Sequence, residues 1–231
     1  MTPTKFTFLN SSMSHSDGIK IESSTPGSAF MVDNSTFYPY QTKNSLKIIG
    51  STGLISRSNF TRSRTVGNLG SSQSAVRILG GSDVQVISSN FTNLTSALGA
   101  AIQISDSAKF VATKCQFHNN TAESGGAVSI TQVPNSILSG NIFTNNSAQK
   151  LDGKPIDMQA DQNKLRGGGL YINCVKSTSN PCLTILKNNN TFAFNYAEMQ
   201  GGAISYRSQG YNDDNTNTFR NNSASVIKAG E

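Results

Sequence analysis

The sequence predicts an all-β fold: a single-stranded, right-handed parallel β-helix of about eight coils, with about 26 residues in each coil. Three observations predict it. A glycine-rich triplet recurs along the chain, a Phe-x-x-Asn-x-Ala motif recurs at a fixed distance from it, and apolar residues alternate with polar ones between them. Repetition at a period of about 20 to 50 residues indicates a solenoid, in which each repeat packs on its neighbours. We therefore interpret residues 1–231 as one solenoid, with the clearest repeats in 75–225.

The two motif series keep a constant separation. The distance from the first glycine of a triplet to the next motif phenylalanine is 18 residues in three of four cases. The triplets are Gly99-Ala100-Ala101, Gly125-Gly126-Ala127, Gly167-Gly168-Gly169 and Gly201-Gly202-Ala203, and the motifs begin at Phe117, Phe143, Phe192 and Phe219. Glycine allows positive φ where the chain turns, and it leaves room for the next coil about 4.8 Å away. Asparagine tolerates the left-handed region, so equivalent turns are expected to stack Asn120, Asn146 and Asn195 into an amide ladder.

The first strand of each coil follows the glycine triplet. Apolar residues stand one and three positions after it, which is the alternation of a half-buried strand. The pairs are Ile102 and Ile104, Val128 and Ile130, Leu170 and Ile172, and Ile204 and Tyr206, and they continue upstream as Val76 and Ile78, Leu46 and Ile48, and Ile19 and Ile21. Because no crossover helix fits between successive copies, we expect these strands to stack in parallel.

The second and third strands complete the predicted coil of three strands and three turns. The second is an apolar stretch about ten residues further on, at Val84 and Val86, Phe110 to Ala112, and Ile137 and Leu138. The third carries the phenylalanine column: Phe60, Phe91, Phe117, Phe143, Phe192 and Phe219, with Phe37 and Phe8 as weaker members. Residues of equal phase are expected to lie side by side, which places Lys109 beside Asp83 in the neighbouring coil.

Two insertions interrupt the period, at about 149–164 and 174–182. Insertions in a solenoid form loops on one face, often the binding face, so these loops are our first candidates for recognising protein domains or glycans. Cys174 and Cys182 lie in the second insertion and suit a small disulfide-closed loop. Cys115, two residues before Phe117, is expected to be a buried, small apolar residue.

The composition gives a net charge of +6 and a pI near 9.3, without a run of like charges. The basic residues gather only loosely, at Arg57, Arg62, Arg64 and Arg77. Two interpretations stay open for them: solvated surface charges that maintain solubility, which we favour, and a face that contacts a polyanion. The sequence shows no sign of specific nucleic-acid binding.

The sequence contains neither a signal peptide nor an apolar run of the roughly 20 residues that cross a bilayer, so we expect no direct membrane insertion. The chain enters and stops in mid-coil, which suggests a fragment of a longer protein with uncapped coils open to end-to-end contact.

Nine Asn-x-Ser/Thr sequons are candidate glycosylation sites if the chain is secreted: Asn10, Asn34, Asn59, Asn90, Asn93, Asn119, Asn145, Asn189 and Asn221.

Catalytic residues are not apparent in the repeat. A polysaccharide hydrolase needs two carboxylates across its substrate, and a lyase needs a carboxylate cluster with a basic proton acceptor. In a β-helix such groups share a phase on consecutive coils, whereas Glu22, Asp83, Asp106 and Asp213 differ in phase and Asp214 has no acidic neighbour at its phase. His15 and His118 have no partner at metal-ligand spacing. We therefore expect no enzyme activity, no cofactor and no metal site.

The Gly-Gly-Ala-Ile/Val/Leu motif paired with Phe-x-x-Asn resembles the repeat of chlamydial polymorphic outer membrane proteins, and equally that of large β-helical surface proteins of ciliates and other protists. The resemblance implies a pectin-lyase-like solenoid that serves as a structural or adhesive module of a larger protein at the cell surface or outside the cell. A carbohydrate-binding or polysaccharide-active β-helix, of lyase or hydrolase type, is the alternative.

Overall fold

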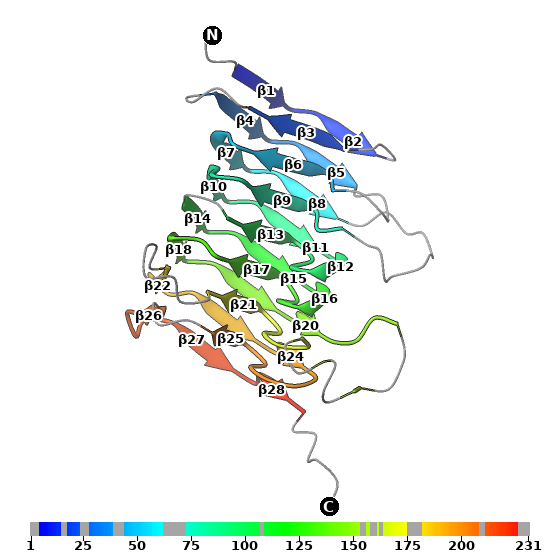
Figure 1. Ribbon diagram of the computed structural model, residues 1–231, viewed down its shortest axis with the longest axis vertical. Helices are drawn as coiled ribbons and strands as arrows, with labels where there is room; N and C mark the ends of the chain where they lie inside the picture. Colours follow the sequence, from blue (N-terminus) through cyan, green and yellow to red (C-terminus); the bar gives the residue numbers. More distant parts are fainter. Residues whose placement is uncertain are drawn as a thin grey trace, which may run out of the picture.

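The computed structural model is an all-β stack of parallel strands, with the N-terminus at one end and the C-terminus at the other (Figure 1). It describes residues 5–14, 18–23, 28–38, 44–61, 73–106, 109–152, 156–157, 161, 164–174, 182–207 and 211–225. Every strand pairs in parallel with the equivalent strand of a neighbouring coil, and the strands inside each sheet pair on both sides. The predicted parallel β-helix solenoid is therefore confirmed.

Two eight-stranded sheets run the length of the stack. Sheet A contains β1 (Lys5–Leu9), β4 (Ala29–Asp33), β7 (Thr52–Ser56), β10 (Asp83–Ile87), β14 (Lys109–Thr113), β18 (Asn135–Ser139), β22 (Leu183–Lys187) and β26 (Tyr211–Asp213). Sheet B contains β2 (Ser12–Ser14), β5 (Thr36–Tyr38), β8 (Asn59–Thr61), β11 (Asn90–Thr92), β15 (Gln116–His118), β19 (Ile142–Thr144), β23 (Thr191–Ala193) and β27 (Thr218–Arg220). Eight strands at the usual spacing of about 4.8 Å span about 34 Å.

Sheets C and D close the coil. Sheet C follows the glycine triplets and contains β3 (Ile19–Glu22), β6 (Leu46–Ile49), β9 (Val76–Leu79), β13 (Ile102–Ser105), β17 (Val128–Thr131), β21 (Leu170–Asn173) and β25 (Ile204–Arg207). Sheet D contains β12 (Thr95–Leu98), β16 (Thr121–Ser124), β20 (Ser147–Ala148), β24 (Tyr196–Ala197) and β28 (Ser223–Ala224). The three-strand prediction is thus wrong from β12 onward. The Ala of Phe-x-x-Asn-x-Ala, to which the three-strand prediction gives no strand, lies in an extended segment that pairs from coil to coil.

A stack of phenylalanine rings fills the interior under sheet B. From Phe37 to Phe192 the rings are fully buried, with centroids 4.5 to 5.1 Å apart and planes within 14° of parallel. Phe219 continues the stack at 5.2 Å, although 46% of it is exposed. One member was assigned wrongly: Met13 occupies the first position of this column, opposite Phe37, whereas Phe8 lies on β1 of sheet A. The Phe8 ring reaches Phe37 only as a tilted contact at 5.3 Å.

A buried amide ladder marks the turn between sheets B and D, as predicted. Asn120, Asn146, Asn195 and Asn222 follow one another, and each Nδ2 donates to Oδ1 of the next residue at 2.9 Å. The same Oδ1 atoms accept the preceding backbone N–H groups at 3.0 to 3.1 Å. The side chains therefore satisfy backbone donors that the turn would otherwise leave unpaired in the interior.

A second inward column, which the sequence analysis missed, lies at the turn between sheets A and B. Its first four members are serines, and its last three are the asparagines Asn141, Asn190 and Asn217, linked by Nδ2 to Oδ1 bonds of 3.0 and 2.8 Å. The serines are Ser11, Ser35, Ser58 and Ser89. Cys115 stands between the two types. Each serine Oγ donates to the carbonyl O two residues back at 2.7 to 3.0 Å, and Cys115 Sγ lies 3.5 Å from the equivalent carbonyl O of Thr113. Cys115 is therefore buried, as expected, in a polar rather than an apolar column.

The outer residues of these turns adopt the left-handed conformation. Asn93, Asn119, Asn145 and Asn221 have φ between 51° and 58° at the turn between sheets B and D. At the glycine triplets the coils approach closely: a Cβ on Gly126 would lie 2.1 Å from the carbonyl O of Gly168. The glycine of the motif is thus required by the neighbouring coil, as the sequence predicts.

Candidate functional site

A column of basic side chains on the outer face of sheet C is the strongest candidate for a binding surface. Lys20 on β3 pairs in register with Lys47 on β6, and Lys47 pairs with Arg77 on β9. Their inward neighbours Ile48 and Ile78 are fully buried, so the alternation of the strands turns the three basic residues outward. We define this cationic column as Lys20, Lys47 and Arg77. Gln103 on β13 is the next residue in the same register.

The sequence analysis overlooked two of these three residues, although a signal was present. Each of the three is the second residue of its sheet C strand, so Lys20, Lys47 and Arg77 occupy the same position in the repeat. We had grouped basic residues by their proximity in the sequence, which assembled Arg57, Arg62, Arg64 and Arg77 instead. Register, rather than sequence distance, determines which side chains are neighbours in a solenoid.

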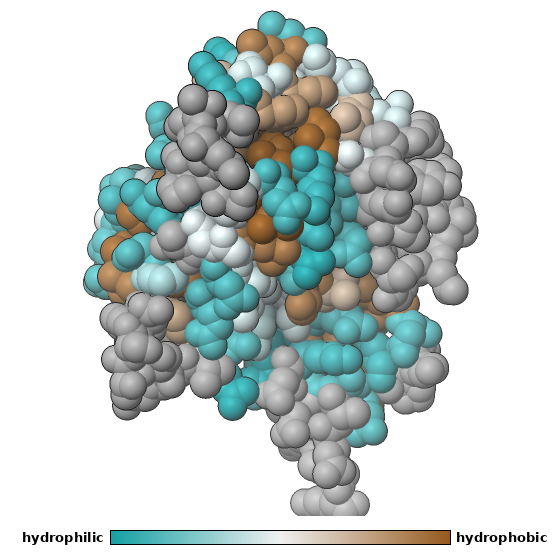
Figure 2. Space-filling model, turned by 45° about the horizontal axis from the view of Figure 1, so that its top comes forward, coloured by the Kyte–Doolittle hydropathy of each residue, from teal (hydrophilic) through white to brown (hydrophobic). Residues whose placement is uncertain are grey.

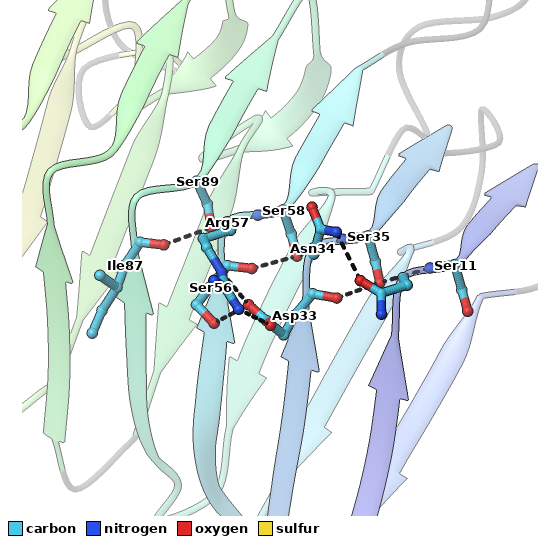
Figure 3. A network of polar contacts seen from close by, with 10 residues as sticks. Ser11, Asp33, Asn34, Ser35, Ser56, Arg57, Ser58, Ile87 and Ser89 are labelled. Carbon is cyan, nitrogen blue, oxygen red and sulfur yellow. Dashed lines mark hydrogen bonds and ion pairs between the residues drawn. The ribbon is translucent and has the colours of Figure 1, made fainter.

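The predicted arginine group does not form one patch. Arg57 lies in the turn between sheets A and B, where its guanidinium binds the Asp33 carboxylate (Figure 3). Arg77 lies on sheet C. The hydrogen bond from Arg57 lowers the pKa of Asp33 to about 2, and a bond from Ser56 adds to the effect. Asp33 thereby neutralises the charge of Arg57. Arg62 and Arg64 lie outside the described residues.

A partly buried ion pair anchors the base of the first insertion. Lys150 Nζ lies 2.8 Å from Asp161 Oδ2, with side chains 15% and 6% exposed. The bond from Lys150 lowers the pKa of Asp161, and the pKa of Lys150 rises in return. The backbone N of Lys150 also donates to Glu198 Oε2 at 2.7 Å, which ties the insertion to the following coil. Much of 149–164 lies outside the described residues, so its recognition role stays a prediction.

A disulfide closes the second insertion, between Cys174 and Cys182. Their Cα atoms are 6.1 Å apart, and Cys174 is buried at the end of β21. Both sulfurs approach Oε1 of Gln132, at 3.6 and 3.7 Å. The bond fixes the two ends of this insertion against the coil that carries Gln132. The loop between them, 175–181, lies outside the described residues.

The nine sequon asparagines occupy outer positions of the coil. Eight are exposed, and Asn59 is half-buried on β8 beside Asn90 of β11. Several neighbours along the stack bind one another directly: Asn34 donates to Asn10 at 2.7 Å, and Asn119 donates to Asn93 at 2.6 Å. The exposed sequons are therefore accessible to solvent, and Asn10 and Asn34, like Asn93 and Asn119, lie one coil apart.

Acidic side chains in the described coils serve local structure. The pKa of Asp214 is lowered by hydrogen bonds from Thr216 and from the backbone N of Asn188. Asp213 accepts from the backbone N of Asn215 and from Nδ2 of Asn217. His118 lies on the outer face of sheet B, with Nδ1 2.9 Å from Thr144 Oγ1. Nowhere in the described ranges do three or more His, Cys, Asp or Glu side chains gather as metal ligands would.

The described part of the chain contains no helix of the length and hydrophobicity that cross a membrane. Figure 2 looks toward the N-terminal end of the stack, where apolar and polar side chains alternate at the surface. Phe6, Phe8, Met13 and Ile19 are partly buried there against the core.

The fold and these surfaces define the chain as a parallel β-helix solenoid. No family model, no curated protein and no solved structure matches it.

Proposed function

We propose that this chain is a non-enzymatic structural or adhesive module of a larger β-helical surface protein, which spaces macromolecular partners or binds them. The observation that carries the proposal is the continuous interior of the solenoid. Six fully buried rings, from Phe37 to Phe192, and the amide ladders join successive coils into one hydrogen-bonded and stacked unit. A repeated unit of this kind grows in one direction and presents extended outer faces, which suits a stalk.

The outer surface supports the same proposal. Sequon asparagines at exposed turns suit a glycosylated protein that has passed through a secretory pathway. The disulfide between Cys174 and Cys182 suits an oxidising compartment. The acidic side chains with lowered pKa values are engaged by Arg57, Lys150 and Thr216, which gives them structural rather than catalytic partners.

Labelling of intact cells tests the surface location. Antibodies raised against the recombinant chain should label intact source cells without permeabilisation, and a glycosidase should reduce the apparent mass of the native protein if the sequons carry glycans. Labelling that requires permeabilisation would contradict a surface role.

A turnover assay separates the module from an enzyme. The purified chain should release no products from a panel of polysaccharides. Turnover that disappears when one carboxylate, such as that of Asp213 or Asp214, is replaced by its amide would favour the polysaccharide-active alternative.

A further inference from the structure

We propose that the cationic column on sheet C binds a linear acidic polysaccharide that runs along the solenoid axis. This inference rests on the proposed binding role and names the class of partner. The column of Lys20, Lys47 and Arg77 places three basic side chains on consecutive coils, in direct register.

The arrangement is unfavourable without an external anion. Like charges directly opposite one another on neighbouring strands repel, and these strands lie about 4.8 Å apart. Lys47 has no ion-pair or hydrogen-bond partner among the described residues, and Arg77 has one, a 3.5 Å contact from Nη1 to Gln73 Oε1. Arg77 Nε is buried and lacks a hydrogen-bond partner in the described coils. Lys20 alone binds an acid, Glu22, with both side chains about half exposed.

Other charged residues on the solenoid do not share this arrangement. Lys109 lies beside Asp83 on sheet A, as the sequence predicted, and Arg57 binds Asp33. Lys150 is paired with Asp161. Lys109, Arg57 and Lys150 thus each have an acid as a neighbour. Lys47 instead has Lys20 on one side and Arg77 on the other. A negatively charged ligand would relieve the repulsion between them.

The spacing of the column determines the shape of the partner. One cation per coil repeats at the strand spacing of about 4.8 Å, perpendicular to the strands. An acidic polysaccharide carries negative groups on successive sugar units of similar length, so an extended chain along the axis can place one anionic group on each coil. Gln103, next in register, extends the column with an uncharged amide that can bind a sugar hydroxyl.

The surroundings favour a polysaccharide over a single-stranded nucleic acid. Proteins that bind single strands combine basic grooves with aromatic side chains on which the bases stack. The outward residues beside Lys47 and Arg77 are the aliphatic Ile49 and Leu79. The nearest tyrosine in the register of the column, Tyr171, is three coils beyond Arg77 and only 7% exposed. The column therefore offers charge without a stacking platform.

A matched pair of double variants tests the inference. Lys47→Gln with Arg77→Gln removes two charges from the column, and Lys109→Gln with Lys187→Gln removes two from sheet A as a control. We would measure binding of each folded protein to polygalacturonate, heparin, neutral dextran and oligo(dT) over a range of salt concentrations. Polygalacturonate carries carboxylates alone and heparin carries sulfates as well, so a comparison of the two shows whether the column needs sulfate.

The column variant should bind the acidic polysaccharides about 2- to 30-fold more weakly than the control variant, as expected for two exposed charge contacts. For the column variant, the slope of log affinity against log salt concentration should decrease in magnitude by about one for each charge removed, as it does for phosphate contacts. A gain-of-function variant, Gln103→Lys, adds a fourth cation in register and should strengthen binding about 1.5- to 5-fold.

Several outcomes would overturn the inference. Equal losses in the two double variants would show that net charge alone attracts the polymer. Tighter binding of oligo(dT) than of either acidic polysaccharide would assign the column to nucleic acid. Absence of binding to both polysaccharides at low salt would refute the column as a site, while cell-surface labelling would still test the stalk function independently.

Discussion

Replacement of Asn146 by alanine tests whether the buried amide ladder stabilises the solenoid. The Asn146 amide takes part in four hydrogen bonds: Nδ2 donates to Phe117 O (3.0 Å) and Asn195 Oδ1 (2.9 Å), and Oδ1 accepts from Asn120 N (3.1 Å) and Asn120 Nδ2 (2.9 Å). The variant leaves the buried backbone N–H of Asn120 and one of its amide hydrogens without an acceptor. Each orphaned donor costs about 1–3 kcal/mol, so the two together should lower the free energy of unfolding by about 2–6 kcal/mol.

Urea denaturation, followed by circular dichroism and by tyrosine fluorescence, would measure this change as a shift of the midpoint. Asn119→Gly is the matched control. Asn119 precedes the ladder residue Asn120, is exposed, and has a φ of 54° that glycine adopts freely, so its replacement should change stability by less than about 0.5 kcal/mol. A loss below about 1 kcal/mol for Asn146→Ala would refute the argument, because it would mean that water or backbone shifts satisfy the orphaned donors.

Three further predictions concern the ring stack, an ion pair and the free thiol. Phe117→Ala should lower the free energy of unfolding by about 3–5 kcal/mol, whereas Phe219→Ala, at the half-exposed end of the stack, should lower it by less than about 1 kcal/mol; equal losses in urea melts would contradict the stacking argument. The pKa of Asp33, lowered from 3.8 to about 2, means that its ion pair contributes stability above pH 4 and loses it as the pH falls through about 2. In Arg57→Gln, NMR titration should show this pKa raised toward 3.8 but short of it, because the bond from Ser56 remains; an unchanged value would exclude Arg57 as the main cause. Burial raises the pKa of Cys115 to about 11, so iodoacetamide at pH 8 should label it only after denaturation, and rapid labelling of the native protein would show an accessible thiol.

The parts of the fold that could be predicted from the sequence are those whose residues recur at the same position in successive repeats. The Ile102 and Ile104 pair, the phenylalanine rings from Phe37 onward and the Asn120 ladder all fall in the predicted register. Met13 and Phe8 show the limit. Near the N-terminus the coil is shorter, the glycine triplet is missing, and nothing in the sequence indicates which apolar residue lies under sheet B.

The surfaces were harder to predict than the interior. The interior favours phenylalanine and asparagine at fixed phases, so phenylalanine recurs from Phe37 onward and the ladder asparagine from Asn120 onward. The outer face tolerates many residues, and Lys20, Lys47 and Arg77 are joined only by register. Similarly, sheet D was missed because Thr95–Leu98 and Thr121–Ser124 lack a strong apolar alternation, and pairing along the stack stabilises them instead.

Because Gly99 and Gly125 occupy the same position in successive repeats, the solenoid can change its length by one whole coil. The two glycines open equivalent triplets 26 residues apart, and Ile102 lies directly beside Val128. Excision of 99–124 would join Leu98 to Gly125 with every ladder still aligned, and duplication of the same segment would insert one more turn. The solenoid can therefore be shortened or lengthened by whole coils, in steps of about 4.8 Å, without any change to the residues of its interior.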